Sequence, residues 1–168
     1  MSATSSQYAL IANQWPELHA EAMRVEECAL SDPRTSCFYA RRTIELLVEW
    51  IYENDSQLQR PYGYGALSDL IYAADFRELA GEEMRRFRLI KDLGNKAVHR
   101  IEPIRPGDAV LAAGELFQVL RWLVLTYGRE PIGECGAISL ILLSYPARPL
   151  QMPSRFRPVS NSSCSPTS

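Results

Sequence analysis

The side chains best suited to chemistry stand together in the segment "DLGNKAVHR", residues 92–100. Asn95 and His99, one of only two histidines, lie four residues apart, which is one turn of a helix. An imidazole can exchange a proton with a ribose hydroxyl near neutral pH, and an amide can donate a directional hydrogen bond to a phosphate. Asn95 and His99 are therefore weak candidates for catalytic residues. A second interpretation stays open, because a histidine near a helix end also interacts favourably with the helix dipole.

A helix over residues 82–98 is predicted to carry this segment. At about 100° per residue, its polar side chains fall within a sector of roughly 150° and its apolar ones on the other side. The apolar stripe, which indicates burial between neighbouring helices, comprises Phe87, Leu89, Ile90, Leu93, Ala97 and Val98. The polar sector comprises Arg85, Arg88, Lys91, Asp92, Asn95, Lys96 and His99. Because this sector is basic overall, we predict that it binds the phosphate groups of a nucleic acid.

Gly94 lies in the middle of the same predicted helix. Glycine costs about 1 kcal/mol relative to alanine in a helix interior. Its presence therefore predicts the close approach of another helix or of a ligand at this position.

A second helix is predicted from Pro33, with Asp32 as its N-cap, to Glu53. Arg41 and Arg42 lie opposite its apolar face, at spacings that let them meet Glu45. Either they form a solvated, salt-bridged face, or they face a ligand. On the second interpretation Arg41 and Arg42 join the candidate nucleic-acid-binding residues.

Two further helices complete the predicted core, one over residues 16–30 and one over 108–127 that ends at Gly128. A long connection after the second helix contains short helical turns and three tyrosines, at positions 62, 64 and 72, which are expected to pack over the bundle more readily than to stack on bases. The sequence thus predicts an all-α protein, an antiparallel four-helix bundle with an elaborated loop between its second and third helices. Residues 1–9 are expected to be a flexible N-terminus, 10–130 the helical domain, and 131–168 a Pro- and Ser-rich tail that is mostly disordered.

The composition excludes several classes of function. The formal net charge of −2 argues against a uniformly basic nucleic-acid binder, so any such binding must be local. The four cysteines form no C-x-x-C pair and the Gly-rich phosphate loops are missing, so no metal or cofactor is expected. The N-terminus does not look like a secretory signal, and the apolar run over residues 138–143 is far shorter than the roughly 20 residues that cross a bilayer. A cytoplasmic protein with reduced thiols and no membrane association is expected.

Five segments together resemble a known family: "SDPRTSCFYARRTIELLVEWIY", "LSDLI", "FRELA", "RLIKDLGNKAVH" and "ELFQVLRWLVLTYGR". They are similar, in order and over about residues 10–130, to the HEPN-like helical domain at the N-terminus of the R subunit of type I restriction endonucleases. The resemblance implies a HEPN-type four-helix bundle, and it implies nucleic acid, DNA or RNA, or restriction-modification subunits as partners. Intact R subunits continue into a nuclease and a helicase motor, which this chain lacks. The resemblance therefore implies a truncated or stand-alone form that neither cuts DNA nor hydrolyses ATP.

Active HEPN ribonucleases carry an arginine followed four to six residues later by a histidine. Carried onto this chain, the histidine is His99 and the polar residue after the arginine is Asn95, but the arginine position holds Gly94. We therefore favour a non-catalytic module that binds nucleic acid or a partner subunit. The alternative is a metal-independent, HEPN-type endoribonuclease that uses His99, as a homodimer in which two such helices face each other.

Overall fold

The structure is a computed structural model that describes residues 6–63, 65–99 and 101–129. Within these ranges the protein is all-α and contains no strand, as predicted. The tail predicted over residues 131–168 lies outside the described residues. The helices are η1 (Gln7–Ile11), α1 (Pro16–Cys28), α2 (Pro33–Asn54), α3 (Leu67–Tyr72), α4 (Ala74–Ala80), η2 (Gly81–Glu83), α5 (Met84–His99) and α6 (Pro106–Tyr127).

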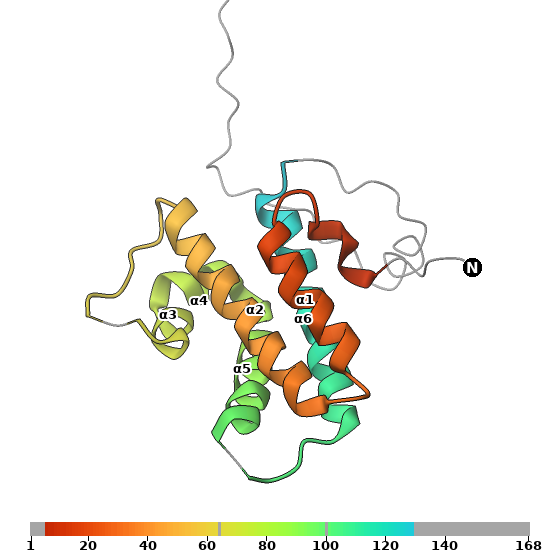
Figure 1. Ribbon diagram of the computed structural model, residues 1–168. Helices are drawn as coiled ribbons and strands as arrows, with labels where there is room; N and C mark the ends of the chain where they lie inside the picture. Colours follow the sequence, from red (N-terminus) through yellow and green to blue (C-terminus); the bar gives the residue numbers. More distant parts are fainter. Residues whose placement is uncertain (1–5, 64, 100, 130–168) are drawn as a thin grey trace, which may run out of the picture. The chain divides into compact units, whose positions relative to one another are not determined.

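The long helix α2 is the centre of the arrangement, because it packs against α1, α5 and α6. In Figure 1, α1 and α2 run in opposite directions, and the short helices α3 and α4 lie beside α2 and α5. The four long helices enclose one apolar core, to which every one of them contributes fully buried side chains. The short helices η1, α3 and α4 also contribute to this core. The largest fully buried side chains are Tyr8, Ile11, Ile44, Leu47, Ile51, Leu70, Ile71, Phe76, Phe87, Ile90, Leu116 and Leu120.

The predicted start of α2 is confirmed in detail. Pro33 occupies the first turn, and the Asp32 carboxylate accepts a hydrogen bond of 3.1 Å from the Thr35 amide. The Thr35 hydroxyl also donates to this carboxylate, and it is the main reason that the pKa of Asp32 lies below its ordinary value. An aspartate with a lowered folded-state pKa stabilises the fold above its unfolded pKa, and the contribution is lost as the pH falls through the folded value.

Replacing Asp32 by asparagine should therefore reduce the stability that the protein loses as the pH falls from neutral to acid. Asparagine keeps a capping oxygen but does not titrate, so stability at pH 7 should change little. Urea unfolding midpoints at pH 7 and pH 3 measure the effect. If D32N loses as much stability between these two pH values as the native chain does, protonation of Asp32 does not contribute to the acid sensitivity of the fold.

The connection between α2 and α5 contains α3 and α4, which confirms the expected short helical turns. The expectation that its tyrosines pack over the bundle is wrong for Tyr62, whose side chain is 98% exposed. Tyr72, at the end of α3, is 43% exposed and contacts cations of α5 instead of the core. Tyr64 lies outside the described residues.

The helical part of the chain begins before residue 10, with η1. Tyr8, placed in the region expected to be flexible, is fully buried, and its hydroxyl donates a 2.9 Å hydrogen bond to the carbonyl of Ala113 in α6. Burial raises the pKa of this phenol well above its ordinary range. The N-terminal turn η1 is thus part of the helical unit.

The helix α6 begins two residues earlier than predicted, at Pro106, and ends at Tyr127 with Gly128 as its C-cap. By length and composition alone, α6 is long and apolar enough to cross a membrane. None of the other described helices meets this test. A core helix passes the same test, and α6 has eight buried residues facing the other helices. Its outward face still exposes Val110, Leu111 and Leu125.

Candidate nucleic-acid interface

Gly94 is the point at which α5 comes closest to α2. A Cβ atom built on Gly94 would lie 2.3 Å from Cβ and 2.6 Å from Cδ of Arg41. Real carbon atoms never approach so closely, so only glycine fits under the Arg41 side chain. Of the two reasons predicted for this glycine, the approach of another helix is therefore the one observed.

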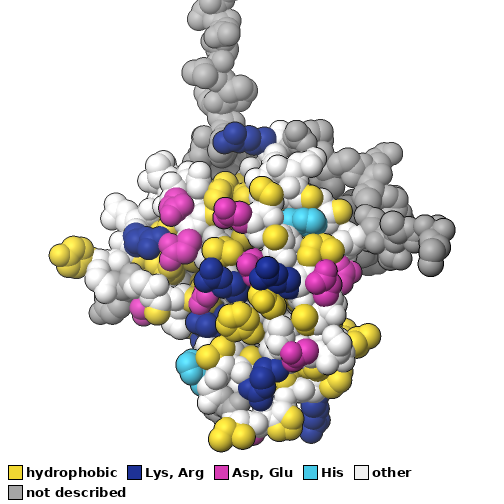
Figure 2. Space-filling model, viewed as in Figure 1, with side chains coloured by type: hydrophobic (Ala, Val, Ile, Leu, Met, Phe, Trp, Pro, Cys, Tyr) yellow, Lys and Arg dark blue, Asp and Glu magenta, His cyan; other side chains and the backbone are white. Residues whose placement is uncertain are grey.

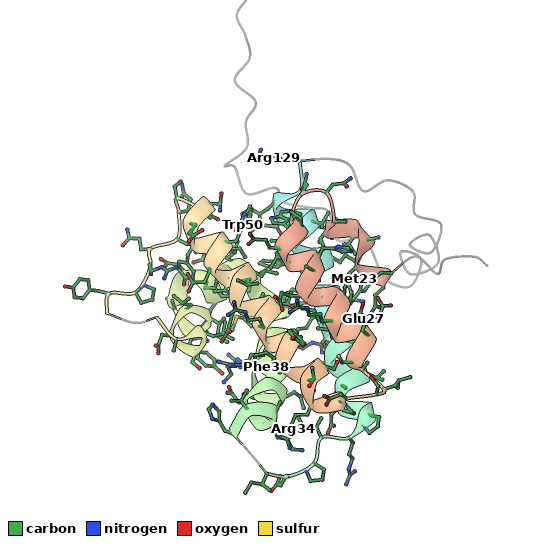
Figure 3. The ribbon with its side chains drawn as sticks, in the orientation of Figure 1. Met23, Glu27, Arg34, Phe38, Trp50 and Arg129 are labelled. Atoms are coloured by element: carbon green, nitrogen blue, oxygen red, sulfur yellow. The ribbon has the colours of Figure 1, made fainter. Side chains whose placement is uncertain are left out.

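Arg34, at the start of α2, holds the C-terminal end of α5. Its guanidinium donates hydrogen bonds of 2.5 Å to the carbonyl of Ala97 and 2.6 Å to the carbonyl of Glu102. The last carbonyls of a helix have no intrahelical partners, so a cation here satisfies them and also complements the helix dipole. In Figure 3 Arg34 lies beside the chain that leaves α5. Arg34 thereby positions the last turn of α5, which carries His99.

The polar sector of α5 faces outward, as predicted. Arg85, Arg88 and His99 are exposed, and the described face contains an open hollow of about 490 Å³. This hollow is lined by Asp92, Asn95, Lys96 and His99. No hydrogen bond joins Asn95 to His99, or Arg88 to Asp92, among the described residues, so Asn95 and His99 can still donate to a ligand in this hollow.

Beside the first half of α5 lies a second hollow, of about 560 Å³, that the sequence did not reveal. Arg77 of α4 reaches it together with Arg85 and Arg88, while Glu78 and Glu82 also line it. Arg77 belongs to α4, whereas Arg85 and Arg88 belong to α5, and the three side chains line the same hollow. Their meeting depends on the turn through Gly81, whose φ of +53° is a conformation that glycine adopts readily.

Tyr72 adds an aromatic ring to the same face. The Arg88 guanidinium lies 5.4 Å, and the Lys91 ammonium 5.3 Å, from the centre of this ring. Lys91 also forms a 3.0 Å ion pair with Asp92. Burial alone would lower the pKa of Lys91, but the hydrogen bond and charge of Asp92, helped by Tyr72, raise it above its ordinary value. Lys91 is therefore a charged but already partnered residue.

Part of the predicted positive charge is neutralised within the protein. Lys96 lies 4.0 Å from Asp108 of α6, in addition to the pair between Lys91 and Asp92. On the face that Figure 2 presents, basic and acidic side chains alternate, and no continuous basic surface is seen. Among the residues that the structure describes, the lysines and arginines of α5 that form no ion pair are Arg85 and Arg88. The strongest attraction for an anion is thus at the N-terminal half of α5, away from His99.

The structure does not bring Arg41 and Arg42 into either hollow. Arg41 packs over Gly94, and its guanidinium forms a 2.7 Å ion pair with Glu45, as the spacing predicted. Arg42 is exposed on the outer face of α2 and lines neither hollow. For Arg41 the salt-bridged interpretation is the one observed.

The predicted apolar stripe of α5 is confirmed for Phe87, Ile90 and Ala97, which are buried. Val98, assigned to that stripe, is 47% exposed. It follows the last buried residue and lies near the helix end, where neighbouring helices no longer cover it.

No family model, no curated protein and no solved structure matches this chain. Among the described residues, no three His, Cys, Asp or Glu side chains gather in an arrangement that could hold a metal ion.

Proposed function

We propose that this chain is a non-catalytic helical module, and that the outward face of α5 binds the phosphate backbone of a nucleic acid. The observation that carries the proposal is the convergence of Arg77, Arg85 and Arg88 beside the exposed ring of Tyr72. Guanidinium groups bind phosphate oxygens through paired hydrogen bonds, and a tyrosine ring can stack on an unpaired base. Asn95 and His99 extend this face by two turns and supply further donors.

The close packing of Gly94 against Arg41 supports a module that is not catalytic. In the HEPN pattern the position of Gly94 carries the arginine that handles the phosphate. Here that position points at Arg41 of α2, where no Cβ atom fits. An arginine side chain at residue 94 would therefore displace α2 instead of reaching a substrate.

The likeness to the N-terminal domain of type I restriction R subunits remains part of the proposal. An all-α core of four long helices with an inserted pair of short helices is compatible with a HEPN-like bundle. On this proposal the module comes from, or acts beside, a DNA-restricting complex. A restriction-modification subunit is then the alternative partner of the α5 face.

Reversing the charge of Arg85 and Arg88 should weaken binding to a fluorescently labelled 20-nucleotide RNA or DNA by about tenfold or more at low salt, because two phosphate contacts are lost. Fluorescence anisotropy measures the affinity. The matched control is R24E/R129E, which changes the net charge equally at two sites that are not on α5. Equal affinities of the two double variants would contradict the proposal.

One observation favours the alternative, a metal-independent endoribonuclease: Asn95 and exposed His99 share one hollow. On this alternative the purified protein cleaves single-stranded RNA in EDTA, and H99A abolishes the cleavage. Our proposal predicts no cleavage by either protein. Cleavage that disappears in H99A would replace the binding module with the enzyme.

A further inference from the structure

A groove lies between the start of α1 and the C-terminal half of α2, away from the residues of α5. Its volume of about 480 Å³ falls within the roughly 300–1,000 Å³ of ligand-binding pockets. Two tryptophans and two leucines line it together with three carboxylates. Among the residues that line it are Trp15, Glu17, Leu46, Glu49, Trp50 and Glu53.

The local sequence explains why these side chains meet. Trp15 immediately precedes Pro16, which begins α1, and Glu17 follows in the first turn. On α2, Leu46, Trp50 and Glu53 stand four and three residues apart, so they lie on one face of the helix. Figure 3 shows Trp50 in the seam between α2 and α1.

The indole of Trp50 is held in a fixed orientation. Trp15 meets it edge to face with ring centres 5.4 Å apart, and Tyr127 does the same at 5.6 Å. The Tyr127 hydroxyl in turn donates a 2.8 Å hydrogen bond to Asp55. Trp50 is only partly buried, so part of its side chain remains accessible from the groove.

The charge around this aromatic surface is negative. Glu17 and Glu53 form no ion pair among the described residues, whereas Glu49 is paired with Arg60. The four cation–π contacts of the described residues all use tyrosine, and no cation lies over Trp15 or Trp50. Tryptophan is the ring that attracts cations most strongly. Among the described residues, these carboxylates form no group that could hold a metal ion.

We propose that this groove binds an arginine side chain of a partner polypeptide. A planar guanidinium suits the site because its face can stack on the Trp50 indole while its edge donates to Glu17 and Glu53. The protein would then have two surfaces of opposite preference, an arginine-bearing face on α5 for anions and this groove for a cationic protein segment. The groove is thus a docking site that does not depend on nucleic-acid binding.

The probe is the peptide acetyl-Gly-Arg-Gly-Arg-Gly-amide, titrated into the full chain while tryptophan fluorescence is followed. Two of the three tryptophans line the groove, so binding should change the emission. The same peptide with citrulline, which has the shape of arginine without its charge, should not bind. The variant E17Q/E53Q should bind the arginine peptide about tenfold more weakly, because two charge-assisted hydrogen bonds are lost.

The control variant E27Q/E102Q removes two exposed carboxylates outside the groove and should bind the arginine peptide as the native chain does. Both variants change surface side chains alone, and circular dichroism checks that each is folded. The proposal is overturned if the arginine peptide leaves the fluorescence unchanged at millimolar concentration. It is also overturned if the citrulline peptide binds equally well or if E17Q/E53Q keeps the native affinity.

Discussion

Replacing Leu120 by alanine is expected to lower the free energy of unfolding by about 2 to 5 kcal/mol. Leu120 is fully buried on the side of α6 that faces the other helices. Its truncation removes apolar burial and leaves a cavity that close-packed neighbours fill only partly. Because a domain of this kind is stable by about 5 to 15 kcal/mol in total, the change should be plain in a urea melt.

The matched control is Leu125→Ala, five residues further along the same helix. Leu125 is 54% exposed, so the same chemical change there should alter stability by no more than about 0.5 kcal/mol. If L120A and L125A unfold at the same urea concentration, the assignment of the core face of α6 is wrong.

Alanine at position 94 is expected to destabilise the fold, although alanine normally favours a helix. The added methyl group would overlap the Cβ of Arg41, an atom at the base of the side chain that cannot swing away. Overpacking of this kind costs about 1 to 3 kcal/mol, and the gain in helix propensity returns about 1 kcal/mol of it. We expect a net loss of up to about 2 kcal/mol, measured by urea or thermal unfolding.

Gly114 provides the opposite case in α6. It is exposed, and a Cβ atom built there meets nothing within 4 Å. Gly114→Ala should therefore stabilise the protein by about 0.5 to 1 kcal/mol. Effects of the same sign at positions 94 and 114 would show that the close approach of α2 and α5 is not what requires Gly94.

The long helices could be predicted because their signals are local. Pro16 and Pro33 mark where two of them begin, Asp32 caps one, and Gly128 ends another. The apolar periodicity of these segments also indicated which faces are buried. In α2, Ile44 is fully buried, while Trp50 is only partly so. A helical period gives the direction of a side chain, but the depth to which a neighbour covers it depends on tertiary packing.

The site could be predicted only in part, for the same reason. The period of α5 placed Arg85, Arg88 and His99 on one outward face, as observed. It did not indicate that Arg77 joins them, because that residue belongs to another helix. Nor did it indicate that Asp108 approaches Lys96 from α6 and weakens the positive charge. Glycine at position 94 signalled a close approach, and only the structure shows that Arg41 makes it.

The salt dependence of nucleic-acid affinity tests the central proposal most directly, since each phosphate contact contributes to its slope. For a single-stranded RNA, the slope of log K against log salt should be shallower in R85E/R88E than in the native chain by about 1.4, which corresponds to two contacts. R24E/R129E should keep the native slope. Identical slopes in all three proteins, or no binding by the native chain even at low salt, would contradict the account.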